Sequence, residues 1–393
     1  MEIVTQSWLR DAKEYKHMKI GIMTINSAYN YGCVLQAWSL QRYLEKEGHE
    51  AFIINYRIPE IDNVYRLFQE RQRFGNQALN ALYNGLRRVK FNLTQKPRIR
   101  KAEKFERFIN ETMNTTQVYS SFKELEEQEA GAQYDVLITG SDQVWNGTIT
   151  KGLKPAYFLE FDHSGKKKIS YAASIGKTQL TNAEREFFAE CLQKYDDIAV
   201  REQSAKKLLE PLVKQKIKVV VDPTLLLERE DFDALKKPPR FRKPYLLVHI
   251  IGKDRNVKNM ARMMSEKLGL RIVQNRMKKQ YENELGRFAD AGPEEFIGLI
   301  ENAAFIVTNS FHATLFAIMY ERNFVTIPHK TYPERMTYLL EHAGLSEHLI
   351  ADTTELPEDF SVPMPDYGKV KARLAKEQEA SRSFLKNCLA KTK

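Results

Sequence analysis

Short runs of apolar residues alternate along this chain with segments whose apolar residues recur every three to four positions. Residues 19–24 (KIGIMT) predict a buried strand, and residues 34–47 predict a helix because Ala37, Leu40 and Leu44 share one face. By the same criteria, further strands are expected at 51–55, 134–139, 168–173, 198–200 and 219–221. Strands that alternate with helices are typical of an α/β fold with parallel sheets.

A second series of strands and helices follows residues 236–244, whose sequence KKPPRFRKP is basic and rich in proline. Its strands are expected at 245–250, 270–274, 305–308 and 324–327, and its helices at 257–267, 294–302 and 313–320. We therefore expect two Rossmann-like domains facing across a cleft, at 18–235 and 245–365, joined by the linker 236–244. Residues 1–17 are expected to be an N-terminal extension, and residues 366–393 a helix that returns to the first domain.

A long polar and basic stretch, residues 60–128, separates two strands of the first domain and predicts a helical insertion. Within it, residues 87–107 hold nine basic residues against Glu103 and Glu106, and the whole chain carries a net charge of +10. The charge has two interpretations, a solvated helix face or a surface that contacts anionic membranes. The stretch has no zinc-finger spacing or aromatic RNA-binding motif, so no nucleic-acid partner is expected.

Several functional classes lack support in the sequence. No apolar run reaches the length of a membrane span. The three cysteines are far apart and lack metal-ligand spacing, which argues against a disulfide framework or a metal site and fits a cytoplasmic protein. The chain also lacks the Gly-x-Gly-x-x-Gly motif of dinucleotide-binding folds and the Gly-x-Ser-x-Gly elbow of hydrolases.

In the first domain, chemically active residues follow strands closely, where ligands collect in parallel sheets. Asn30 and Tyr31 lie in a loop that leads into a helix, a position that serves either as an ordinary turn or as an anion site. Asp142, Gln143 and Trp145 follow another strand. They suit a hydroxyl-rich sugar, although Asp142 would also suit a helix cap.

Two more segments of this kind contain an arginine and a histidine. Arg201 directly follows a strand and could bind a phosphate or carboxylate, or pair with the adjacent Glu202. Ser310 and His312 stand where a strand becomes a helix in the second domain. A histidine there can donate a proton, although a single histidine is more often structural.

Taken in order, several segments resemble the polysaccharide pyruvyl transferase family, and in particular its bacterial branch. They are NYGCVLQAWSL, GSDQVWN, SYAASIG, VREQSA, VDPTLLL and TNSFHATLFAI. GSDQVWN and NSFHATLFAI are the most specific of them, and the resemblance extends over most of the chain. It implies a fold like that of the GT-B glycosyltransferases.

The resemblance also implies a reaction in exopolysaccharide or capsule biosynthesis. Pyruvate passes from phosphoenolpyruvate to two hydroxyls of a free or lipid-linked sugar, giving a cyclic ketal and phosphate. His312 matches the family's histidine and is the expected acid, and Arg201 matches a family arginine that binds the donor. The chemistry needs an acid and cations but no metal or redox cofactor. Asp142 is expected to orient or deprotonate the acceptor, whose contacts are expected at Asn30, Tyr31, Gln143 and Trp145.

Two positions depart from the family's pattern. Ser310 stands where some relatives have arginine, and Gly176 and Lys177 stand where some have histidine. We therefore expect Arg335 or Lys177 to supply donor charge, with Ser310 beside them. The alternatives are a GT-B glycosyltransferase with a nucleotide-sugar donor and a non-catalytic polysaccharide-assembly protein. The basic stretch would allow peripheral contact with the inner face of the membrane, and in the non-catalytic protein it would be a face that docks on the membrane or on a partner.

Overall fold

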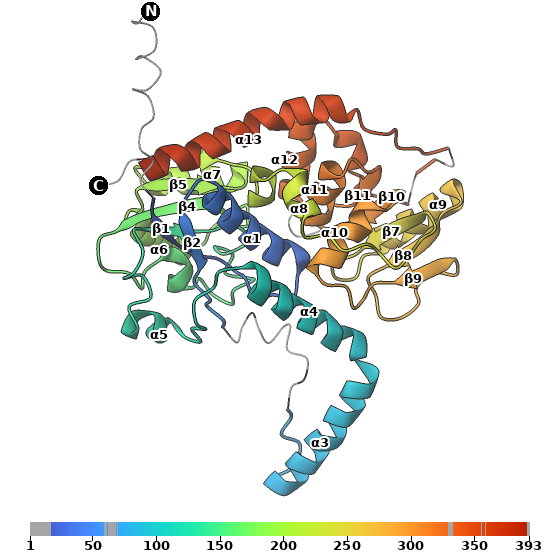
Figure 1. Cartoon of the computed structure of the whole chain (residues 1–393), viewed down its shortest axis with the longest axis horizontal. Helices are drawn as coiled ribbons and strands as arrows, with labels where there is room; N and C mark the ends of the chain where they lie inside the picture. Colours follow the sequence, from blue (N-terminus) through green and yellow to red (C-terminus); the bar gives the residue numbers. More distant parts are fainter. Residues whose placement is uncertain are drawn as a thin grey trace, which may run out of the picture.

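The computed structural model describes residues 17–58, 61, 68, 70–328, 333–354, 356–357 and 359–390. It contains two parallel β-sheets, each packed between helices, side by side in one molecule (Figure 1). The predicted fold of two Rossmann-like domains is therefore confirmed. The expected extension 1–17 lies outside the described residues except for His17.

The first sheet has the strand order β2-β1-β3-β4-β5-β6, and all its strand pairs are parallel. Its strands are β1 (Lys19–Met23), β2 (Glu50–Ile53), β3 (Val136–Thr139), β4 (Lys167–Ala173), β5 (Asp197–Val200) and β6 (Lys218–Val219). The helices around it are α1 (Tyr31–Lys46), α6 (Asn182–Leu192) and α7 (Gln203–Leu209). Every residue of β3 and β4 is buried, as expected for strands covered by helices on both faces.

The second sheet has the order β11-β10-β7-β8-β9, again with parallel pairs. Its strands are β7 (Tyr245–His249), β8 (Arg271–Gln274), β9 (Glu284–Arg287), β10 (Phe305–Thr308) and β11 (Phe324–Thr326). Its helices are α9 (Arg255–Leu268), α10 (Pro293–Glu301), α11 (Phe311–Met319) and α12 (Glu334–Ala343). Strand β9 was not predicted, because it is a short edge strand without an alternating apolar pattern.

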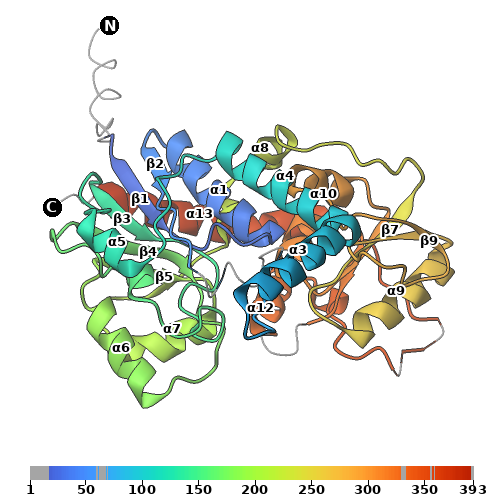
Figure 2. The same ribbon diagram turned by 90° about the horizontal axis from the view of Figure 1, so that it is seen from below.

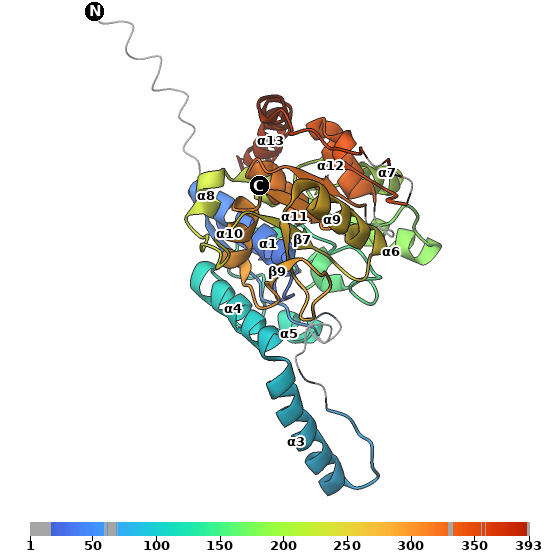
Figure 3. The same cartoon turned by 90° about the vertical axis from the view of Figure 1, so that its right-hand side faces the viewer.

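The basic insertion contains α3 (Gln77–Thr94), α4 (Lys96–Thr112) and α5 (Phe122–Glu127). Helix α3 extends away from the body, whereas α4 lies along it (Figures 1 and 3). Phe105, Phe108 and Ile109 of α4 are buried in the main core, and Lys101 packs over the ring of Tyr31. The insertion is therefore only partly exposed, because the apolar face of the second half of α4 packs on the core.

The two halves are joined by apolar packing and by the C-terminal helix. Tyr31 of α1 stacks on Phe296 of α10, with ring centroids 4.1 Å apart. Helix α13 (Tyr367–Ala390) passes behind both halves in the view of Figure 2. In the C-terminal half of α13, Ser381 Oγ accepts a hydrogen bond from the backbone of Val221, just after the first sheet. None of the helices in the described part of the chain is long and apolar enough to cross a bilayer.

Candidate active site

A cavity of about 400 Å³ lies between the two domains and is here called the central cavity. Its walls come from residues that follow β1, β3 and β10, together with the start of α12. The carboxyl ends of both sheets therefore contribute to it, as expected for parallel α/β domains. The sequence-predicted site residues in its wall are Asn30, Asp142, Gln143, Ser310, His312 and Arg335.

Two helix N-termini border the central cavity. Asn30 caps α1 by accepting a hydrogen bond from the backbone of Gly32 at 3.0 Å, and Ser310 caps α11 by accepting one from Ala313 at 3.3 Å. Asparagine and serine are among the residues best suited to this role, so the sequence itself begins both helices here. The partial positive charge of each N-terminus favours an anion in the cavity.

His312 lies beside a buried carboxylate. Its Nε2 is 3.3 Å from Oδ2 of Asp222, and Asp222 is 3% exposed. Burial by itself would raise the pKa of Asp222, but His312 and Arg201 offset this and hold that pKa well below its usual range. Asp222 is therefore ionised at neutral pH and fixes the orientation of the His312 ring.

Asp222 also binds Arg201, whose Nη1 donates to Oδ2 at 2.7 Å. Burial would lower the pKa of Arg201, but Asp222, Asp142 and Glu202 raise it, so the guanidinium stays charged. Its side chain is only 3% exposed and is not part of the wall of the central cavity. The structure thus places Arg201 behind His312, where it supports Asp222.

Asp142 enters the cavity wall from a strained turn. Its φ is +71°, an uncommon conformation for a residue with a side chain, and its carbonyl accepts a hydrogen bond from Ser174 at 3.0 Å. Its carboxylate lies 3.9 Å from Nη2 of Arg201. The backbone conformation that turns Asp142 toward the cavity is held by the neighbouring strand β4, and strain of this kind is often found at functional sites.

Arg335 is the guanidinium that reaches the central cavity. Burial and then repulsion from Arg201 lower its pKa to about 10, which leaves it charged at neutral pH. Its Nε is buried and has no hydrogen-bond partner among the described residues. Lys151 and Asp142 line the same cavity, so its wall contains two cations and a carboxylate. An unpaired buried donor in a cavity wall is typical of a group that binds a ligand.

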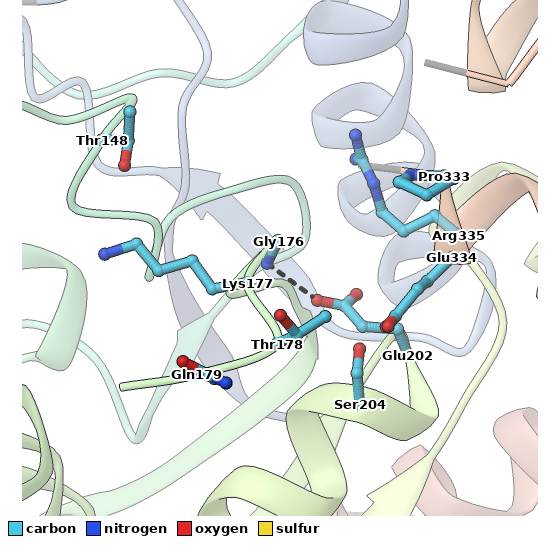
Figure 4. Close-up of a pocket in the computed structure, with 10 residues that line it drawn as sticks. All are labelled: Thr148, Gly176, Lys177, Thr178, Gln179, Glu202, Ser204, Pro333, Glu334 and Arg335. Atoms are coloured by element: carbon cyan, nitrogen blue, oxygen red, sulfur yellow. Dashed lines mark hydrogen bonds between the residues drawn. The ribbon is translucent and has the colours of Figure 1, made fainter. Parts of the chain in front are cut away.

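A second cavity of about 370 Å³ adjoins the first and shares Thr148 and Arg335 with it. Figure 4 shows Lys177 and Arg335 in its wall with Glu202 between them. Lys177 forms an ion pair with Glu184 at 2.5 Å. Glu202 accepts hydrogen bonds from Ser174 and from the backbone of Ile175 and Gly176, which fixes the loop that carries Lys177.

Two expected acceptor contacts are corrected by the structure. Trp145 is fully buried, stacks on Phe158, and its indole N–H donates to the carbonyl of Tyr157 at 3.1 Å. Tyr31 is buried between the domains, and its hydroxyl donates to the carbonyl of Ala291 at 3.0 Å. Both aromatic rings have core partners, so neither side chain lines the central cavity.

Sequence reasoning missed the role of Asp222 and the anchoring role of Glu202. Asp222 stands in the segment VDPT directly after a predicted strand, the same kind of position that singled out Arg201. That position could have indicated a site residue, but its pairing with His312 could not be predicted because the two residues belong to different domains. Among the described residues, no group of histidine, cysteine and acidic side chains has the arrangement of a metal site.

The fold and the site define a two-domain α/β protein with a cavity in its cleft that is lined by Lys151, Arg335 and two helix N-termini. The family model described as polysaccharide pyruvyl transferase matches residues 30–331, which is most of the chain. The protein therefore belongs to the polysaccharide pyruvyl transferase family, a family of transferases. No curated protein matches the sequence.

Among solved structures, the chain is similar to spinosyn forosaminyltransferase SpnP, with 11% identity, a TM-score of 0.46 and 96% of each chain covered. It is similar to Arabidopsis thaliana UGT89C1, with 11% identity, a TM-score of 0.47 and 96% and 94% coverage of this chain and that one. It is also similar to UDP-GlcNAc 2-epimerase from Methanocaldococcus jannaschii, with 14% identity, a TM-score of 0.48 and 92% and 93% coverage. The fold assignment rests on the strand order and the parallel pairing of the two sheets.

Proposed function

We propose that this protein transfers pyruvate from phosphoenolpyruvate to two hydroxyls of a sugar, which forms a cyclic ketal and releases phosphate. The observation that carries the proposal is the pairing of His312 with Asp222 at 3.3 Å, in the wall of a cavity bordered by cations and two helix N-termini. Phosphoenolpyruvate presents a phosphate and a carboxylate, and both are anions that such an environment favours.

The reaction requires a proton at the methylene carbon of phosphoenolpyruvate. Nε2 of His312 lies 3.3 Å from Asp222 but has no hydrogen-bond partner among the described residues, whereas Nδ1 lies against Gly32 near the start of α1. In our proposal, protonated His312 delivers this proton, and a sugar hydroxyl bonds to the neighbouring carbon and passes its own proton to Asp142. The second hydroxyl then bonds to the same carbon, the carbon–oxygen bond to phosphate breaks, and the proton of the second hydroxyl leaves with the phosphate.

The other residues have supporting roles in this scheme. Arg335 binds an anionic group of the donor, and Ser310 and the N-terminus of α11 lie beside it. Arg201 is a positioning residue that acts through Asp222. Asn30, Gln143 and Asp142 contact the acceptor in the central cavity, and Lys177 supplies charge in the second cavity for the donor or for an anionic acceptor.

The donor can be tested without knowledge of the acceptor. Isothermal titration calorimetry and thermal unfolding are measured with phosphoenolpyruvate and, in parallel, with a panel of nucleotide sugars. Binding of phosphoenolpyruvate that is lost in Arg335→Ala supports the proposal. Binding of a nucleotide sugar without binding of phosphoenolpyruvate would instead make the protein a glycosyltransferase. Phosphate release with lipid-linked and nucleotide-linked sugars then identifies the acceptor.

A further inference from the structure

Helix α3 carries a row of large apolar side chains that nothing in the described structure covers. Residues 79, 82, 86, 89 and 93 are Leu, Leu, Leu, Val and Leu, spaced so that they share one face. They are 50%, 63%, 66%, 60% and 66% exposed. We call these five residues the α3 stripe. A contiguous exposed apolar surface of this kind marks an interaction site.

The opposite face of α3 is already occupied. Asn80 and Asn84 are buried, and their side chains bond to the backbone of residues 71–74. Phe91 packs on Phe68 with ring centroids 5.7 Å apart. The preceding segment therefore holds the helix by its polar and aromatic face and leaves the α3 stripe outward, on an element that extends away from the body (Figures 1 and 3).

The charged residues within the segment 71–102, which contains the stripe, all have one sign. Residues 71–102 contain nine Lys and Arg and no Asp or Glu. The exposed cations among them are Arg71, Arg73, Arg88, Lys90, Lys96, Arg98 and Arg100. Glu70, which pairs with Arg88 at 3.5 Å, and Glu103 lie just outside this segment.

The spacing of the stripe fits two occupants, another copy of the helix or a lipid surface, and the charge decides between them. Pairing two α3 segments would bring together the cations of both copies without any acidic residue in the segment to offset their repulsion. An anionic bilayer neutralises these cations and accepts leucine and valine below its headgroups. We propose that α3 binds the surface of an anionic lipid bilayer, with its stripe inserted and its cations against the headgroups.

This placement would bring the central cavity near the membrane. Helix α4 follows α3 directly, and Phe105 of α4 packs against Tyr31 at the start of α1, with ring centroids 5.4 Å apart. Ile61, which precedes α3 in the same insertion, lines the central cavity. The α3 stripe lies outside the active site, so its binding to lipid can be tested without the proposed reaction and without any turnover.

The test is co-sedimentation of the full chain with vesicles of phosphatidylcholine alone or mixed with phosphatidylglycerol, at low and high salt. The wild type is expected to bind the anionic vesicles and to bind less at high salt, because salt screens exposed charges. Leu82→Ser/Leu86→Ser should lower the partition coefficient by about tenfold or more, since burial of each leucine contributes to binding. The matched control, Leu268→Ser/Met364→Ser, changes two exposed apolar residues elsewhere and should leave binding unchanged.

The cations are tested in the same assay. Lys90→Gln/Lys96→Gln should weaken binding to anionic vesicles by about tenfold, whereas Lys214→Gln/Lys216→Gln removes the same charge elsewhere and should have little effect. If both double lysine variants lost vesicle binding equally, the attraction would be non-specific, and the proposal would be overturned. Undiminished binding of the leucine variant would also overturn it.

A direct readout of insertion is available because Cys33, Cys191 and Cys388 are all buried. When Leu86→Cys is labelled with an environment-sensitive dye, the fluorescence emission of the dye should shift to shorter wavelength with anionic vesicles. The emission of the same dye on Leu268→Cys should not shift. Light scattering without lipid measures self-association. A wild-type dimer that the leucine variant converts to a monomer, with vesicle binding intact, would assign the stripe to a second copy and overturn the membrane proposal.

Discussion

The imidazole of His312 lies directly on the backbone of Gly32, so closely that a Cβ atom at position 32 would fall 1.9 Å from its Nδ1. Gly32 is the second residue of α1 in the first domain, and His312 is the second residue of α11 in the second. The two helix N-termini that border the central cavity therefore meet through these residues. Glycine is required here for space, because the site brings a ring of one domain onto the backbone of the other.

Gly32→Ala should move the His312 ring or separate the two helices. We expect the free energy of unfolding to fall by about 1–3 kcal/mol, the usual cost of overpacking. Gly85→Ala is the control, because Gly85 lies in α3 and a Cβ atom at this position would have no neighbour within 4 Å. This substitution should raise the free energy of unfolding by about 0.5–1 kcal/mol. Urea unfolding of both variants tests this, and equal stabilities would argue against the contact.

His312→Ala should retain donor binding but lose turnover by about a hundredfold or more, the usual scale for a general acid. Calorimetry with phosphoenolpyruvate measures the first property and phosphate release the second. His342→Ala, which changes a partly exposed histidine of α12, should have little effect on either. Near-normal turnover in His312→Ala would remove His312 from the mechanism.

Arg335→Ala should weaken phosphoenolpyruvate binding by about ten- to a hundredfold, as expected when a hydrogen bond to a charged group is lost. Arg335→Lys keeps the charge but not the planar fork, so its affinity should lie between those of the wild type and the alanine variant. The exposed Arg262→Ala provides a control for loss of charge alone. Unchanged affinity in Arg335→Ala would show that the donor binds elsewhere.

Asp222→Asn should leave Arg201 buried without its charged partner and lower the free energy of unfolding at pH 7 by about 3–5 kcal/mol. Because the pKa of Asp222 is depressed in the folded state, the stability it contributes is present above the unfolded pKa of about 4 and is lost as pH falls further. The difference in the free energy of unfolding between the wild type and Asp222→Asn should therefore be smaller in acid than at pH 7.

The control for this prediction is Asp231→Asn, which breaks a pair at 2.8 Å with Lys46, a side chain that is 43% exposed, and should lower the free energy of unfolding by at most about 1 kcal/mol. Urea unfolding at pH 7 and at pH 3 measures both variants. If Asp222→Asn destabilised equally at the two pH values, the depressed pKa would not describe Asp222.

His249 should make the protein less stable in acid. It is buried at the end of β7, and burial, with Lys101 next in effect, lowers its pKa to about 3. The unfolded chain takes up a proton on this residue near pH 6.5 and the folded chain does not, so stability falls as pH drops from about 6.5 to 3. His249→Phe should make that slope shallower by about 1.4 kcal/mol per pH unit.

Phenylalanine suits this position because His249 already packs among aromatic rings, including Phe288 and Phe296. Urea unfolding between pH 4 and 7 gives the slope for both proteins. His163→Phe, at an exposed position, should leave the slope unchanged. Parallel slopes for wild type and His249→Phe would show that folding does not lower the pKa of His249.

Local patterns in the sequence were enough to predict the α/β class and the positions of most strands. They were also enough to place Asp142, Ser310 and His312 at strand ends, because the carboxyl ends of parallel strands collect at one edge of a sheet. The edge strand β9 was missed because its residues 284–287 are only partly buried and show no period of two.

The tertiary structure alone decided which of these side chains face the cavity. Trp145 and Tyr31 follow strands as Asp142 does, yet their rings pack in the core, because burial depends on neighbours that are distant in sequence. The pairing of His312 with Asp222 depends in the same way on how two domains pack together. The sequence by itself determined the fold class, the strand-end positions and the basic segment, since each is set by residues close together in the chain. The ion pairs of the site and the outward face of α3 were decided by contacts between distant segments, which no local pattern specifies.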